Sequence, residues 1–193
     1  MRDILSTVSA RGRRTPHGCR THGFTLIELM LVVTVVGILA SVAIPSVTRA
    51  RAASLEVSTI GTLRALNNAQ MSYATTCAGG NYAPTVVSLS TPPGTSKNAF
   101  IGPGFTANTF NRAGYQIVFS AGARVPTARA SCNGIAAGQT VASYFVAANP
   151  ATSGTGAPIR YFGTSGGATI FQSTIRVPVF LTGVPPAPAK PVQ

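Results

Sequence analysis

The sequence predicts an α+β fold in which one long N-terminal helix packs on a small antiparallel sheet. Three observations lead to this prediction. An apolar run occupies residues 24–47, an amphipathic pattern follows it through residues 48–76, and only short β-like runs occur later, separated by Gly and Pro. Of the 193 residues, 45% are hydrophobic and 9% are charged. This composition supports a folded core and excludes a disordered chain.

Residues 1–23 form a basic leader ahead of the apolar run. They contain five arginines and one acidic residue, Asp3, and they are interrupted by Gly and Pro. A basic segment before an apolar helix is typical of a targeting region, so we expect the leader to be removed. The positive-inside rule keeps this segment in the cytoplasm and leaves the C-terminal part of the chain on the other side of the membrane.

The apolar run at residues 24–47 is long enough to span a bilayer. As a helix, these 24 residues extend over about 36 Å, whereas the hydrocarbon core of a bilayer is about 30 Å thick. Glu28 carries the one charge in this run. Pro45 lacks a backbone donor and Gly37 has a low helix propensity, so both are predicted points of bending.

Residues 48–76 continue the helix with one buried face. Apolar and small side chains recur at intervals of three and four residues, namely Ala52, Leu55, Thr59, Leu63, Leu66, Ala69 and Tyr73. Arg64 and Asn68 fall on the opposite face. Glu56 is expected to be solvated and to pair with Arg51 or Arg64. The paired glycines after Cys77 predict that the helix ends near residue 76.

Residues 77–184 form the predicted globular part. Their first third, up to residue 113, is rich in Gly, Pro, Ser, Thr and Asn and is expected to be a long connection. β-like runs then occur at residues 115–120, 144–148, 159–162 and 169–172. The last two flank a Gly-rich turn and predict a hairpin, and residues 177–181 predict an edge strand whose pairing Pro178 limits. The Pro-rich residues 185–193 predict an extended, mobile tail.

The distribution of reactive side chains argues against an enzyme. The acidic residues are Asp3, Glu28 and Glu56, and both histidines, His17 and His22, lie in the leader. After its removal the remaining 170 residues contain two Glu, no Asp and no His. Acid–base catalysis, metal ligation and paired carboxylates all require such side chains. The sequence therefore predicts no catalytic residues, no cofactor and no metal site.

The stretch that begins at Gly23, GFTLIELMLVV, resembles the N-terminal signature of type IV pilins and of the pseudopilins of type II secretion. Gly23, Phe24, Thr25, Leu26 and Glu28 match this pattern together, at the head of an apolar helix. Gly37 and Pro45 also match helix-weakening positions of the family. The resemblance covers about residues 20–75 and implies a pilin-like fold.

The family resemblance also implies roles for individual residues. A prepilin peptidase would cut between Gly23 and Phe24 on the cytoplasmic side and methylate the new amino group of Phe24. Glu28 would pair with the N-terminal amine of a neighbouring subunit during filament assembly. A carboxylate in an apolar span costs roughly 2–3 kcal/mol and calls for such a partner. The alternative is an interfacial glutamate that reaches the lipid headgroups.

The cysteines divide between the leader and the globular part. Cys19 leaves with the leader, so Cys77 and Cys132 remain as an even pair in a non-cytosolic compartment. A bridge between them would tie the end of the long helix to the β region and contribute about 3–4 kcal/mol. Two free thiols are the alternative.

We therefore expect a structural subunit of a type IV pilus-like filament that polymerises through its N-terminal helix. The subunit would wait in the inner membrane as a single-pass protein with its C-terminal domain in the periplasm, and would then join a periplasmic or extracellular filament. The resemblance implies other pilin subunits, the prepilin peptidase, an assembly platform and a motor as partners.

Three alternatives stay open. The first is a type II secretion pseudopilin. Some of these proteins hold calcium with C-terminal acidic residues, and their lack in this sequence weakens the case for this alternative. DNA binding, known for some minor pilins, is suggested by the ten basic and two acidic residues after the leader, a formal charge of +8. In a secreted protein, residues 29–44 would be the core of a signal peptide cut after Ala50-Arg51-Ala52. The ten basic residues on which the DNA-binding alternative depends are scattered along the chain, at Arg49, Arg51, Arg64, Lys97, Arg112, Arg124, Arg129, Arg160, Arg176 and Lys190.

Overall fold

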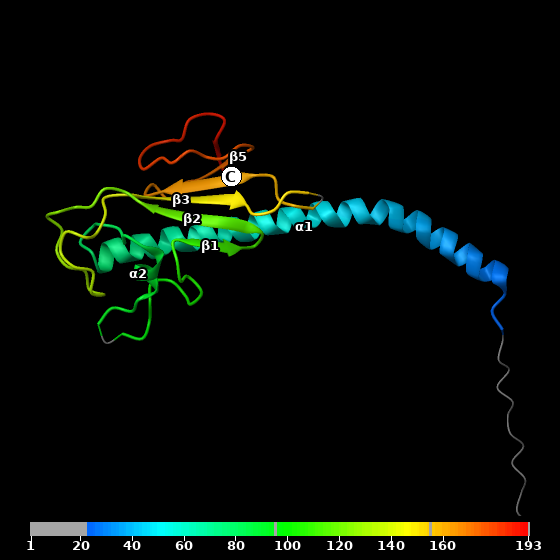
Figure 1. Cartoon of the computed structure of the whole chain (residues 1–193), viewed down its shortest axis with the longest axis horizontal. Coiled ribbons are helices and arrows are strands. Elements are labelled where there is room, and N and C mark those ends of the chain that lie inside the picture. Colours follow the sequence, from blue (N-terminus) through cyan, green and yellow to red (C-terminus); the bar gives the residue numbers. More distant parts are fainter. Residues whose placement is uncertain (1–22, 95, 155, 193) are drawn as a thin grey trace, which may run out of the picture. The chain divides into compact units, whose positions relative to one another are not determined.

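The computed structural model describes residues 23–94, 96–154 and 156–192, which divide into two compact units with a boundary between Val42 and Ala43. The leader, with Cys19 and both histidines, lies outside the described residues apart from Gly23. Within the described chain, a 51-residue helix, α1 (Leu26–Thr76), precedes an antiparallel sheet (Figure 1). The predicted α+β class is therefore confirmed.

The first unit consists of the apolar part of α1. Its side chains are exposed, and Ile27, for example, is 76% accessible. The most apolar 18-residue window of α1 is long enough to cross a membrane, and none of it is buried inside the fold. A helix that is hydrophobic on all sides and covered by nothing in its own chain is suited to a lipid or helix-bundle environment.

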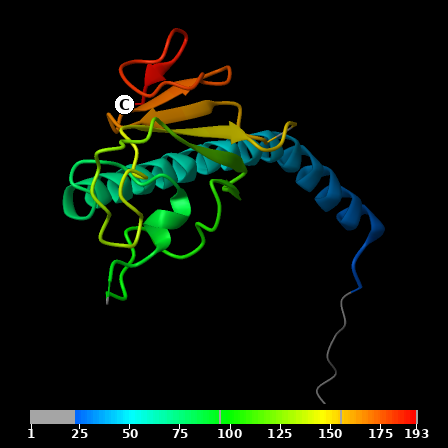
Figure 2. The same cartoon turned by 60° about the vertical axis from the view of Figure 1, so that its left-hand side comes forward.

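The second unit packs the C-terminal part of α1 against a six-stranded sheet. The strand order β1-β2-β3-β4-β5-β6 follows the sequence, and all neighbours are antiparallel. The strands are β1 (Thr109–Arg112), β2 (Tyr115–Ala121), β3 (Tyr144–Pro150), β4 (Tyr161–Ser165), β5 (Ile170–Ser173) and β6 (Lys190–Pro191). Figures 1 and 2 both show the sheet lying along this part of the helix.

The main core lies between α1 and the sheet. The predicted inward face of the helix is buried at Thr59, Leu63, Leu66, Ala69 and Tyr73. The alternating residues of the central strands meet it, namely Tyr115, Ile117, Phe119, Tyr144, Val146, Ala148 and Phe162. Arg64 and Asn68 are exposed, as the period predicts. The helix thus buries residues at intervals of three and four, the strands bury every second residue, and the two buried faces pack against each other.

A second apolar cluster covers the opposite face of the sheet. Val177 and Phe180 pack there against Phe145, Ala147 and Phe171, which the strands point away from α1. The predicted edge strand at residues 177–181 is therefore wrong. These side chains are buried on the outer face of the sheet instead of in a ladder, and Pro178 lacks the N–H that a ladder needs.

Three segments differ from the prediction. The connection before residue 113 contains a helix, α2 (Val86–Ser90), whose N-cap Thr85 accepts a hydrogen bond from the N–H of Ser88 at 3.1 Å, and it also contains β1. The hairpin forms, but β4 extends to Ser165, so that its turn lies beyond Gly163. The tail, predicted to be mobile, pairs Lys190 with Gln172, and Val192 donates to the carbonyl of Ile170 at 2.8 Å.

Candidate assembly site

The N-terminal end of α1 has the geometry of a capped helix. Thr25 precedes the first helical residue, and its Oγ1 accepts a hydrogen bond from the N–H of Glu28 at 3.3 Å. Thr25 and Glu28 thus occupy the N-cap and N3 positions, and a carboxylate in this first turn interacts favourably with the helix dipole. Local sequence alone therefore places Glu28 in the first turn of the helix.

Gly23 and Phe24 lie just before this cap. Both are exposed, and the Phe24 side chain is 68% accessible. A peptide bond in such a position is open to a protease, and the absence of a side chain on Gly23 leaves its backbone unobstructed. Gly37 and Pro45 lie further along α1, which continues through both of them.

Glu28 has no cationic partner within the described part of its own chain. Among residues 23–94, 96–154 and 156–192, the one ion pair joins Glu56 to Arg160. Glu28 is also exposed, on the apolar first unit. The described part of the chain thus presents a carboxylate on an apolar surface without a neutralising charge, and a cation from another molecule could complete the pair.

The predicted pair of cysteines is joined in the structure. Cys77 directly follows α1, Cys132 lies in the connection between β2 and β3, and their Cα atoms are 4.9 Å apart across the disulfide. The N–H of Cys132 also donates to the carbonyl of Cys77 at 3.2 Å. Gly79 and Gly80, both with positive φ, end the helix just beyond, as predicted.

Glu56 was predicted to pair with Arg51 or Arg64, but it pairs with Arg160 instead. Its Oε2 lies 3.7 Å from Nη1 of Arg160, and its side chain is only 13% accessible. Arg160 precedes β4 and also donates to Oε1 of Gln172 at 3.3 Å. Sequence spacing gave no signal for this pair, because the helix and the strand are brought together only by the tertiary fold.

Tyr115 completes this junction between α1 and the sheet. Its hydroxyl donates to the carbonyl of Arg160 at 2.8 Å. Burial raises the pKa of Tyr115, and the nearby Glu56 carboxylate raises it further, against a smaller opposite effect of Arg160. The phenol therefore stays neutral and keeps donating throughout the physiological range.

The described residues do not place a cluster of metal-ligating side chains near these features. Within the described residues, no group of three or more His, Cys, Asp or Glu side chains is placed to hold a metal ion. The residues singled out by the sequence are instead distributed along one helix and its end. This arrangement is suited to packing and covalent processing.

The N-terminal region of the chain is similar to known proteins. Residues 19–44 match the family model of the prokaryotic N-terminal methylation motif. The chain is 48% identical over 54 residues to the type IV major pilin protein PilA of Myxococcus xanthus (strain DK1622). That match covers 28% of this chain and 24% of the relative, about a quarter of its length. No solved structure matches the chain significantly. The N-terminal region of this chain therefore carries the prokaryotic, prepilin-type N-terminal methylation motif at the head of a type IV pilin-like helix.

Proposed function

We propose that this chain is a structural subunit of a type IV pilus-like filament, made as a precursor and polymerised through α1. The observation that carries the proposal is the methylation motif at residues 19–44, followed at once by an apolar helix that its own chain does not cover. Subunits would be held in the inner membrane by this helix before assembly. In the filament, the same helices would bury their apolar surfaces against one another.

Processing is the first step of the proposal. A prepilin peptidase cuts between Gly23 and Phe24 and methylates the amino group of Phe24. Intact-protein mass spectrometry of the exported protein should find a chain that starts at Phe24 and carries one extra methyl group. Replacing Gly23 with a bulky residue should leave the full precursor in the membrane. A mature chain that starts at Ala53 would instead establish the secreted alternative.

Assembly is the second step, and it depends on Glu28. The carboxylate attracts the Phe24 amine of the incoming subunit within an apolar bundle, where charges are weakly screened. Such a head-to-tail contact repeats without closing and generates a fibre. The platform and the motor of the filament would supply the subunits and the work of extrusion.

Substitution of Glu28 separates assembly from membrane anchoring. Glu28→Ala removes a costly charge from the span, so membrane retention should stay equal or increase. Filament number should fall sharply. Glu28→Gln keeps the shape and removes the charge, and it should fail in the same way if attraction sets the register. Electron microscopy of cells with matched subunit levels counts the filaments, and normal filaments in both variants would contradict the role of Glu28.

A DNA-binding minor pilin is the second candidate. It is favoured by the charge imbalance, since ten basic residues and two glutamates follow the cleavage site. Phosphate contacts predict a binding constant that falls steeply with salt. Gel-shift titrations of the mature protein at two salt concentrations distinguish this candidate from a purely structural subunit, which should not shift DNA at either one.

A further inference from the structure

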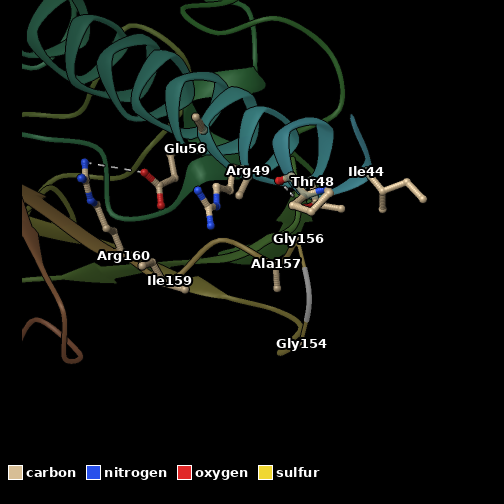
Figure 3. A pocket seen from close by; sticks show the side chains of 12 residues that line it. Ile44, Thr48, Arg49, Glu56, Gly154, Gly156, Ala157, Ile159 and Arg160 are labelled. Carbon is tan, nitrogen blue, oxygen red and sulfur yellow. Dashed lines mark hydrogen bonds and ion pairs between the residues drawn. The ribbon is translucent and has the colours of Figure 1, made fainter. Parts of the chain in front are cut away.

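A cleft in the second unit has one wall on α1 and one on the segment before β4. Its volume is about 570 Å³. Figure 3 shows Arg49 and Glu56 extending from the helix towards Ile159 and Arg160 on the opposite wall. Half of the twelve lining residues have apolar side chains, namely Ile44, Pro45, Ala52, Ala53, Ala157 and Ile159. The cleft therefore combines an apolar lining with charged groups on both of its walls.

The charges in the cleft leave one guanidinium without a partner. Glu56 pairs with Arg160, with their atoms 3.7 Å apart. No carboxylate lies within 4 Å of the Arg49 guanidinium in the described chain. The cleft thus carries one net positive charge beside an apolar lining. This combination fits an amphiphile with an anionic head and an apolar body.

The position of the cleft along α1 narrows the choice of amphiphile. Arg49 is two residues beyond Val47, where the apolar run ends, which corresponds to about 3 Å along a helix. In the proposed membrane-anchored subunit the hydrocarbon core ends with the apolar run, so the headgroup layer, roughly 5–8 Å thick, begins at this level. Ile44 is 62% accessible and belongs to the apolar run, at the end of the cleft away from Arg160 (Figure 3). It exposes apolar surface where acyl chains would meet the headgroups.

From this geometry we infer that the cleft binds the headgroup of an anionic phospholipid from the membrane that α1 spans. The Arg49 guanidinium contacts the phosphate with up to two hydrogen bonds, while Ile44 contacts the glycerol and upper acyl region. This inference rests on the proposed membrane-anchored subunit. The lipid would orient the globular unit at the membrane surface before assembly and would be given up when the subunit enters the filament.

Native mass spectrometry of the full chain tests the inference. The chain is placed in detergent micelles with equal amounts of phosphatidylglycerol and phosphatidylcholine of the same acyl chains, and the lipid adducts are counted. Phosphatidylglycerol adducts should dominate. Arg49→Gln should lower the ratio of the two adducts about fivefold, as expected for one arginine near an anionic headgroup. Ala53→Leu, which fills the apolar side, should reduce phosphatidylglycerol adducts without changing any charge.

Arg51→Gln is the matched control. Arg51 is exposed, lies on the same turn of α1 and does not line the cleft, so its loss should change the ratio less than twofold. Equal effects of the two substitutions would overturn the inference, because they would indicate diffuse attraction. It would also be overturned if glycerol phosphate alone competed as well as the whole lipid, or if dimers of the chain excluded the lipid. Flotation with liposomes tests anchoring separately, and its failure would contradict the proposed function instead.

Discussion

Gly163 lies in β4, next to Val177 of the segment that covers the outer face of the sheet. A Cβ at this position would lie 2.9 Å from Cγ1 of Val177 and 3.2 Å from Cε2 of Phe145. Val177 is β-branched and buried, so its side chain has little freedom to move aside. The absence of a side chain at residue 163 thus allows the C-terminal segment to approach the sheet closely.

Gly163→Ala should lower the free energy of unfolding by about 1–3 kcal/mol, because it overfills a packed site. Gly167→Ala is the control. That residue lies in the turn after β4 with no heavy atom within 4 Å of an added Cβ, so its effect should be close to zero. Thermal unfolding of the full chain in detergent, followed by near-ultraviolet circular dichroism, measures both. Equal changes in the melting temperature would show that the outer cluster is loosely packed.

The sequence predicted which face of the helix is buried, but it did not predict the hydrogen-bond partners of the polar side chains on that face. Asn67, which is buried, donates to Thr164 Oγ1 at 2.9 Å and accepts from the Tyr144 hydroxyl at 3.0 Å. Gln70 bonds the N–H and the carbonyl of Ala83. Periodicity marks a face of the helix, whereas these partners are distant in sequence and meet only in the fold.

Among the elements, the connection between β2 and β3 is attached to the end of α1 by the disulfide. The bridge closes 55 residues and joins the end of the helix to a segment without regular structure. Asn133, next to Cys132, reinforces the junction by donating to the carbonyl of Ser88 in α2 at 2.6 Å. The bridge and this hydrogen bond therefore attach the same connection to two helices.

Replacing both Cys77 and Cys132 with Ser should lower the free energy of unfolding by about 3–4 kcal/mol, because the unfolded chain loses a covalent loop. The matched control is the wild-type chain in reducing buffer, which should be destabilised by a similar amount. Non-reducing peptide mapping of exported protein should recover the two cysteines linked. Alkylation of both thiols without prior reduction would contradict the bridge.

The elements also differ in how far the sequence revealed them. The bounds of the long helix were predicted to within two residues. Its hydrophobic pattern continues over 51 residues, so single residues of low helix propensity do not obscure it. The helix at residues 86–90 and the strand at residues 109–112 each contain no more than five residues, too few to show a period. The two-residue β6 includes a proline and forms because β5 offers a free edge.

In the whole molecule it is the second unit that holds a sheet between two apolar clusters, and three tyrosines are buried in this unit. Tyr73, Tyr115 and Tyr144 are at most 1% accessible. Burial raises the pKa of each of these phenols above its ordinary value. Composition alone indicates an apolar core, but it does not say which phenols lie inside it, because that depends on the register between helix and strands.

These phenols make the stability of the fold sensitive to alkaline pH. A phenol that is neutral in the folded chain and ionises more readily in the unfolded chain contributes stability that is fully present below the unfolded pKa of about 10. That stability is lost as the pH rises towards the folded pKa. In this interval each such phenol lowers the free energy of unfolding by about 1.4 kcal/mol per pH unit.

Tyr144→Phe isolates one of these contributions. The variant loses the hydrogen bond to Asn67, so it should be less stable than wild type at pH 8. Its free energy of unfolding should then fall less steeply between pH 10 and pH 11.5 than that of the wild type, by about 1.4 kcal/mol per pH unit. Urea unfolding of the full chain in detergent at a series of pH values gives both slopes, and titration of all other groups cancels in their difference. Parallel curves would mean that the Tyr144 phenol ionises in the folded chain as it does in the unfolded one, and that the core between α1 and the sheet admits water.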